Sequence, residues 1–562
     1  MRIKDWFSAI AVALASAVFY AFFTASFVYP DETARMVNVW LGLDTATYAP
    51  YPLMRFFALP FGASNFFSLG CLAVSVVLLY SLVCVFLRQR SSVALESKSQ
   101  KIGTIGALAA AVVFIFSPGV REAAIRFDTG LFDTAWALLA FSLLIPFSQL
   151  PRKVSWIMPL LSGVMMALGM TDSIAFGFLM PFYFAAFWMV SLKSGGRGYG
   201  TAAIFFFAFL LAGVFAALPA IGDFKAYFDD QKKAVDMFFS IRLWFVIPLF
   251  AVLPFFASVF SSIVAFGGER GMVVRVFHAI VTVIAIFASV TQLSPEALMA
   301  PFGFSPVIFS VFTSVTIGYL FAYWWVEATS VKRGASHIVG LVGGGFLATV
   351  LFFALTIGFF FDFNPRAGEF ADEVASRVLS DMGERSWLVT DGLIDDNIRR
   401  VAAENGKRLV LVSLRRENDV AYIERLAAAV KEAKIGGEKL SAELCEILLK
   451  HQGYRKNRLL PFLDHWFKND PQVASKVAVW GAPHIWMSSG IEPIPERYFF
   501  GGDPARKCDW TETWKEVDPV LGASSGWGSY VLFNYKTARK IPYVDRVRYN
   551  YLRHIGLLAT NQ

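Results

Sequence analysis

The residues with the most informative position for chemistry are two adjacent carboxylates, Asp31 and Glu32. They follow Pro30, directly after an apolar run over residues 7–29. Ionisable side chains at the edge of a membrane segment are costly to keep and usually serve a function, and a carboxylate there can accept a proton from a reacting group. The pair could instead cap a helix in the following loop, because acidic side chains stabilise helix N-termini. A catalytic base and a helix cap are the two interpretations of this pair.

A second group of charged residues lies near residues 121–133. Asp128 and Asp133 could bind a divalent cation or orient a reacting group, or they could mark a solvated loop and a helix start. Arg126, and Arg55 further upstream, could hold a phosphate through charge-assisted hydrogen bonds, or could anchor the chain at a membrane interface. Asp172, between two short apolar runs, could line a cavity or sit in a turn.

The common motifs of soluble enzymes are missing from the sequence. The six histidines form no pair at zinc-ligand spacing, and there is no Walker loop, nucleophile elbow or dinucleotide fingerprint. We therefore predict no metal site and no defined cofactor beyond the possible divalent cation.

The composition places these residues in an integral membrane protein. Of the 562 residues 56% are apolar and 17% are charged, and the mean hydropathy is +0.53. A helix needs about 20 apolar residues to cross a bilayer. The sequence predicts about eleven spans, at residues 7–29, 65–87, 103–118, 130–147, 155–169, 173–191, 201–220, 243–265, 273–291, 305–326 and 337–361, with Met170 to Asp172 separating the fifth from the sixth.

Charge alternates from loop to loop and predicts the orientation. Lysine and arginine gather near residues 88–101, 152–153, 193–197, 270–275 and 332–333, whereas acidic residues dominate the loops between them. Cytoplasmic loops are enriched in lysine and arginine, so the N-terminus is predicted to be cytoplasmic and the chain from residue 362 onward to lie outside. This orientation accounts for the net charge of +8 at least as well as a nucleic acid would, and no nucleic-acid partner is expected.

Two domains follow from the change in composition: a transmembrane domain at residues 1–361 and a soluble α/β domain at residues 362–562. In the second, strands are predicted at 386–391, 407–413 and 476–480, and helices near 368–381, 393–405, 418–434, 440–451 and 456–467. This alternation favours a parallel sheet. Aromatic residues in the tail, such as Trp510 and Trp514, could recognise an acceptor or could be ordinary core.

Four short segments resemble a known family. They are YPDETAR at residues 29–35, YAPYPLMRFFALPFG at 48–62, FSP at 116–118 and ALGMTD at 167–172. Together they resemble the GT-C superfamily of polytopic glycosyltransferases, in particular its bacterial branch related to protein O-mannosyltransferases. The resemblance covers about the first 190 residues, and the later spans match only in number and pattern.

The resemblance implies a GT-C-like membrane fold and a function. Such enzymes transfer a sugar, here a hexose such as mannose, from a polyprenyl-phosphate carrier to a protein or glycan acceptor on the outer face of the bacterial inner membrane. Asp31 matches the position of the catalytic base, with Glu32 beside it. Tyr51, Arg55, Arg126, Asp128, Asp133 and Asp172 are then candidates for binding the substrate or its phosphate.

Two other functions are compatible with the sequence. A secondary transporter also uses eleven or twelve helices with intramembrane acids, although here the charges gather in outer loops. A non-catalytic component of envelope assembly is favoured by the adjacent Asp31–Glu32 pair, which replaces the spaced acidic motif of the family. A transporter predicts polar residues in broken helices at the middle of the membrane.

Overall fold

The protein divides into two compact units. The computed structural model describes residues 3–25, 32–90, 96–143, 156–177, 179, 183, 198–231, 272–290, 305–329, 335–362, 369–392, 394–449, 459–480, 484–496, 498–503 and 505. The first unit contains the described residues of Met1–Ala25 and Tyr51–Pro365, and the second those of Ser26–Pro50 and Arg366–Gly528. Residues 32–50, which the sequence assigns to the membrane domain, therefore group with the C-terminal part of the chain.

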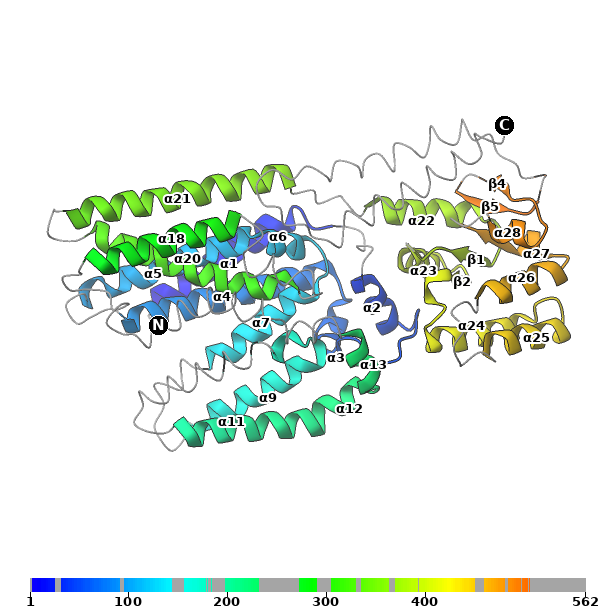
Figure 1. Ribbon diagram of the computed structural model, residues 1–562, viewed down its shortest axis with the longest axis horizontal. Helices are drawn as coiled ribbons and strands as arrows, with labels where there is room; N and C mark the ends of the chain where they lie inside the picture. The colour runs from blue at the N-terminus through cyan, green and yellow to red at the C-terminus, as the bar shows by residue number, and fades with distance from the viewer. Residues whose placement is uncertain are drawn as a thin grey trace. The chain divides into compact units, whose positions relative to one another are not determined.

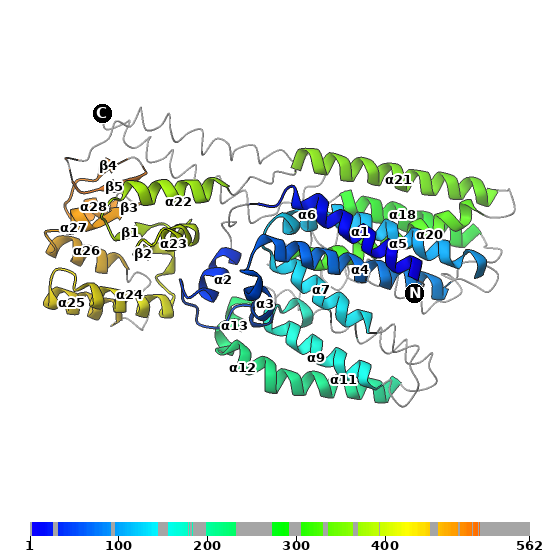
Figure 2. The same ribbon diagram turned by 180° about the vertical axis from the view of Figure 1, so that it is seen from behind.

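The described secondary-structure elements of the first unit are all helices (Figures 1 and 2). Its elements are α1 (Ile3–Ala21), α3 (Pro52–Ala58), η1 (Leu59–Phe61), α4 (Asn65–Arg90), α5 (Glu96–Phe116), α6 (Pro118–Ile125), α7 (Thr129–Ser142), α9 (Ile157–Asp172), α11 (Gly198–Ala212), η3 (Gly213–Ala217), α12 (Leu218–Ile221), α13 (Phe224–Asp230), α18 (Met272–Val290), α20 (Pro306–Ala328) and α21 (Ala335–Asp362). Helix α4 packs on α1, α5 and α7, helix α20 packs on α5 and α21, and α9 packs on α11 and α7.

Several helices of this unit are suited to cross a membrane. In the described part of the chain five are long and apolar enough, or six if the bent pair α5–α6 forms one span. They are Lys4–Ala21, Asn65–Arg88, Ala203–Ile221, Val307–Ala328 and His337–Ala354, with Lys101–Phe116 plus Pro118–Ile125 as the bent pair. The predicted spans at 155–169 and 273–291 coincide with shorter apolar helices, and those at 173–191 and 243–265 fall largely outside the described residues. The span predicted at 130–147 is described as far as residue 143 and corresponds to the 14-residue helix α7, which is not among the candidate spans. Helix α9 continues through Met170 to Asp172, so the turn predicted at these residues is wrong.

Prolines account for two irregular points in these helices. Helices α5 and α6 meet at 63° around Ser117, where Pro118 begins α6 and has no amide N–H to continue α5. The π-helical turn η3 precedes Pro219, whose ring would collide with the carbonyl four residues earlier in a regular α-helix. The wider turn relieves that collision.

The second unit is built on a sheet of five strands in the order β2-β1-β3-β5-β4. Strands β2, β1 and β3 are parallel, whereas β5 and β4 extend the sheet with antiparallel pairs. Its elements are α2 (Glu32–Trp40), α22 (Glu369–Asp381), β1 (Trp387–Thr390), α23 (Asp395–Glu404), β2 (Val410–Ser413), η6 (Leu414–Arg416), α24 (Val420–Ala433), α25 (Glu438–Leu449), α26 (Leu459–Asn469), α27 (Val473–Lys476), β3 (Val477–Val479), α28 (His484–Ser488), β4 (Ile494–Glu496) and β5 (Phe499–Gly501).

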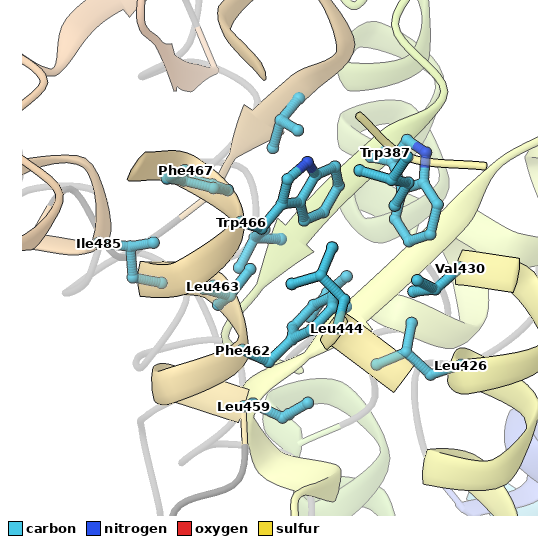
Figure 3. Packing of buried hydrophobic residues seen from close by; sticks show 14 of the residues in the cluster. Trp387, Leu426, Val430, Leu444, Leu459, Phe462, Leu463, Trp466, Phe467 and Ile485 are labelled. Atoms are coloured by element: carbon cyan, nitrogen blue, oxygen red, sulfur yellow. The ribbon is translucent and has the colours of Figure 1, made fainter. Parts of the chain in front are cut away.

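Helices cover both faces of this sheet because alternate residues of the parallel strands point to opposite sides. Trp387 and Val389 of β1 pack against α24, α25, α26 and α28, in a cluster centred on Trp466 (Figure 3). Leu388 of the same strand points to the other face, where it packs with residues of α22 and α23. The result is a three-layer α/β/α arrangement.

Candidate active site

Asp172, at the end of α9, holds the start of α3. Its carboxylate is buried and accepts hydrogen bonds from the backbone N–H groups of Leu53 (2.9 Å) and Met54 (2.7 Å). Helix N-termini leave such N–H groups without partners inside the helix, so Asp172 caps α3 from a segment distant in the sequence. Thr171 Oγ1 also donates to this carboxylate, at 3.0 Å. From the sequence, Asp172 could line a cavity or sit in a turn. In the structure its role is to cap α3.

Asp172→Ala is expected to destabilise α3 by about 1–3 kcal/mol, because two helix-terminal N–H groups lose their acceptor. Hydrogen exchange of the full-length protein, read at the amides of Leu53 and Met54, measures this change. The matched control is Asp223→Ala, which removes the cap of α13 and should leave α3 unchanged. Equal exchange of α3 in wild type and Asp172→Ala would contradict this role.

The start of α7 is organised by Asp128. One carboxylate oxygen accepts from the Gly130 N–H at 2.8 Å, which makes Asp128 the N-cap, and the other pairs with Arg126 at 3.1 Å. The backbone is fixed by helix α4, where Ser68 Oγ accepts from the Asp128 N–H at 3.0 Å and Asn65 Oδ1 accepts from the Phe127 N–H at 2.6 Å. Asp128 therefore caps α7, and Arg126 forms an ion pair with it.

Asp133 lies inside α7 and is buried, which excludes the solvated loop that was one of its two interpretations. Its Oδ1 has no hydrogen-bond partner among the described residues. Asp128 and Asp172 are the charged groups that act on this carboxylate, which brings three of the predicted site residues into one neighbourhood.

This neighbourhood is a poor fit for a divalent cation. The hard cations Mg²⁺ and Ca²⁺ take six or more oxygen ligands, yet both oxygens of Asp128 are engaged by Gly130 and Arg126. Within the described residues no group of three His, Cys, Asp or Glu side chains is placed to hold a metal ion. We therefore derive no chemical step through a metal.

Helix α3 presents a mixed aromatic and basic surface. In α3, Phe56 is 76% exposed and Arg55 is also exposed, and Phe61 of the following turn η1 is 66% exposed. On its other side Phe57 contacts Phe132 of α7, with ring centroids 5.9 Å apart. Aromatic rings with a nearby arginine are typical of segments that lie at a membrane interface.

Tyr51 is the N-cap of α3 and has a left-handed backbone, with φ of 48°. A bulky residue rarely adopts this backbone conformation. Residues that are held in rare backbone conformations are frequent at functional sites. Its carbonyl accepts the Arg55 N–H at 2.9 Å, so the strained residue is fixed to the helix that follows.

Of the predicted catalytic pair, the structure describes one residue. Asp31 falls outside the described residues, and Glu32 is the first residue of α2, in the second unit. Tyr51, Arg55, Arg126, Asp128, Asp133 and Asp172 all belong to the first unit. Helix α2 begins at Glu32, which is compatible with both interpretations, so the catalytic and the capping role of the pair stay predictions.

A buried carboxylate that sequence reasoning did not single out lies shortly after α2. Asp44 is 5% exposed, and its carboxylate contacts Arg399 and Arg416, each at 2.6 Å. Burial alone would raise the pKa of Asp44, but these two guanidinium groups and the Thr45 N–H more than offset burial, so the pKa lies below its usual value. An acid followed by a threonine in a polar loop gives little local signal of such a partner.

Comparison with known proteins found no matching protein-family model and no matching curated protein. The resemblance to GT-C enzymes therefore rests on the four short segments of this sequence.

Proposed function

We propose that this protein is a GT-C-type glycosyltransferase. In this proposal it moves a hexosyl group, such as mannosyl, from a polyprenyl-phosphate-linked donor to a protein or glycan acceptor on the outer face of the bacterial inner membrane. The N-terminus is cytoplasmic, and residues from 362 onward lie on the outer side.

The observation that carries the proposal is the surface of α3. This short helix joins an exposed arginine, Arg55, to exposed phenylalanines, directly before the apolar helix α4. A lipid-linked phosphate needs an apolar surface for its tail and a cation for its head group, and arginine is well suited to bind phosphate. The cap from Asp172 gives this helix a fixed start.

The proposed reaction needs one base and one leaving-group site. The Asp31 carboxylate takes the proton of an acceptor hydroxyl, and the oxygen attacks the anomeric carbon from the face opposite the phosphate. The bond between that carbon and the phosphate oxygen breaks, and polyprenyl phosphate leaves with the electron pair. A cationic side chain is needed to stabilise the charge that develops on this phosphate. The product has inverted anomeric configuration.

The placement of charge in the helices favours an enzyme over a transporter. Asp5 pairs with Arg88 at 2.6 Å, and Arg275 pairs with Glu327 at 3.3 Å. Each of these residues lies within the first or last turn of its helix. At the two irregular points described above, Ser117–Pro118 and Gly213–Ala217, Ser117 is the one polar side chain and none is charged. A transporter would gather polar residues at such breaks.

The test is profiling of glycans and glycoproteins in cells that carry Asp31→Asn beside wild type, with equal expression and membrane insertion. Loss of a general base lowers a rate by about 10²–10⁴-fold, so one glycan species should fall by at least about a hundredfold. Asp223→Asn, a change in another predicted outer acid, is the matched control and should leave the profile unchanged. An unchanged profile in both Asp31→Asn and Glu32→Gln would contradict the proposal.

A further inference from the structure

Residues 32–50 are an integral part of the second unit. Ala34, Met36, Val37 and Trp40 of α2 are buried. Trp40 Nε1 donates to the carbonyl of Pro50 at 2.8 Å, and the carbonyl of Asn38 accepts from the N–H groups of Leu43 and Asp44, which folds the segment back on itself.

Charges on this segment are matched by charges on the rest of the unit. Arg416 Nη1 donates to both oxygens of Asp44, at 2.7 and 2.6 Å, and Arg399 Nη1 lies 2.6 Å from Oδ2. A second ion pair has the charges exchanged: Arg35 of the segment pairs with Asp419 of the rest of the unit, at 3.0 Å. Asn38, which is 1% exposed, donates to the carbonyl and the carboxylate of Asp396. We call Asp44 with Arg399 and Arg416 the Asp44 latch.

The latch lies at the carboxyl end of the sheet, the end at which α/β folds bind ligands. Arg416 follows the carboxyl end of β2 in η6, and Arg399 lies in the helix that follows β1. Ligands of parallel sheets bind beyond the carboxyl ends of the strands. At this position Arg399 and Arg416 are suited to bind an anionic ligand, and the anion that they contact is the carboxylate of Asp44. Arg416 is further oriented by Asp419, at 2.7 Å, and by the ring of Tyr422, 4.4 Å below its guanidinium.

We propose that the second unit is a receptor for the first outer loop and that Asp44 is the anion it recognises. The latch fixes the segment that carries Glu32 and follows Asp31, so Asp44 is a positioning residue for the catalytic pair. This role rests on the proposed function, whereas the docking itself does not.

The experiment uses full-length protein in lipid nanodiscs and compares wild type, Asp44→Asn, Asp44→Glu and Arg35→Ala. Hydrogen exchange of a peptide spanning residues 33–45 reports docking, and amides of β1 report that the unit stays folded. Breaking a buried charge pair is strongly destabilising, so Asp44→Asn should speed exchange of this peptide by about tenfold or more, with β1 unchanged. Asp44→Glu keeps the charge and should restore most of the protection. Arg35→Ala, at the exposed end of the segment, should give a smaller increase.

The matched control is Arg400→Ala, because Arg400 lies in α23 beside Arg399 but pairs with the exposed Glu404. It should leave the peptide unchanged. Glycan profiling is repeated in cells that carry the Asp44 variants. The glycan that is lost in Asp31→Asn should fall about tenfold in Asp44→Asn and recover in Asp44→Glu. Unchanged exchange in Asp44→Asn would overturn the receptor role. Faster exchange with a full glycan level would overturn the positioning role. If neither Asp31→Asn nor Glu32→Gln changes any glycan, the proposed function fails and the exchange data alone decide the docking.

Discussion

Trp466→Ala is expected to lower the free energy of unfolding of the second unit by about 3–5 kcal/mol. The Trp466 side chain is 0% exposed and lies at the centre of the larger core cluster (Figure 3). Its ring meets Trp387 of β1 edge to face with centroids 4.9 Å apart, and its Nε1 donates to Asp470 at 3.1 Å. Removing the indole leaves a cavity between helix and sheet and takes the donor away from a buried carboxylate.

Hydrogen exchange of the slowest amides of β1 in the full-length protein measures this loss, since these amides exchange through opening of the whole core. Leu460→Ala is the matched control, because Leu460 lies on the same helix but is 40% exposed. It should cost less than about 1 kcal/mol. Similar losses in both variants would show that α26 is not part of the stabilising core.

The second large effect is expected at a buried ion pair that joins β4 to the start of β1. Arg385 donates to both oxygens of Glu496, at 2.8 and 2.7 Å, and its guanidinium lies 5.3 Å from the Phe499 ring. The Arg385 side chain is 1% exposed. Glu496→Ala leaves this charge buried without its partner, and the second unit should lose about 3–5 kcal/mol.

Two further variants separate this effect from a general response to lost charge. The exposed pair Arg377–Glu373 is the matched control, and Glu373→Ala should cost less than about 1 kcal/mol. The double variant Arg385→Met with Glu496→Leu should regain most of the stability, because apolar residues of similar volume avoid the burial of an unpaired charge. A loss in Glu496→Ala as small as that of Glu373→Ala would refute the importance of this pair. The measurement is the same exchange of β1 amides.

The elements that local patterns specify are found close to their predicted positions. Strands predicted at 386–391, 407–413 and 476–480 appear as β1, β2 and β3, because short runs of β-branched and apolar residues between turns favour buried strands. The helices α22 to α26 begin and end within a few residues of their predicted ranges. Strands β4 and β5 were not predicted, because they are three residues long and depend on contacts such as Arg385–Glu496.

The partners of the candidate site residues are harder to predict from the sequence than the helices and strands. Asp128 precedes Thr129 and a helical pattern, so its capping role had a local signal. The hydrogen bonds of Asp172 to Leu53 and Met54, and the contacts of Asp44 with Arg399 and Arg416, join segments far apart in the chain. A single sequence specifies periodicity and turn chemistry, but it contains no information on which distant charges meet.

The arrangement of Asp44 also bears on how the protein is made. Its partner Arg416 is synthesised 372 residues later, which at about 5–20 residues per second takes roughly 20–70 s of translation. During that interval the carboxylate and the apolar side of α2 have no counterpart in the nascent chain, and most of the helices of the first unit emerge from the ribosome meanwhile. A chain that stops before Arg416 would keep this surface open permanently. Quality-control proteases and chaperones that detect unfinished chains would find such a surface at residues 32–50.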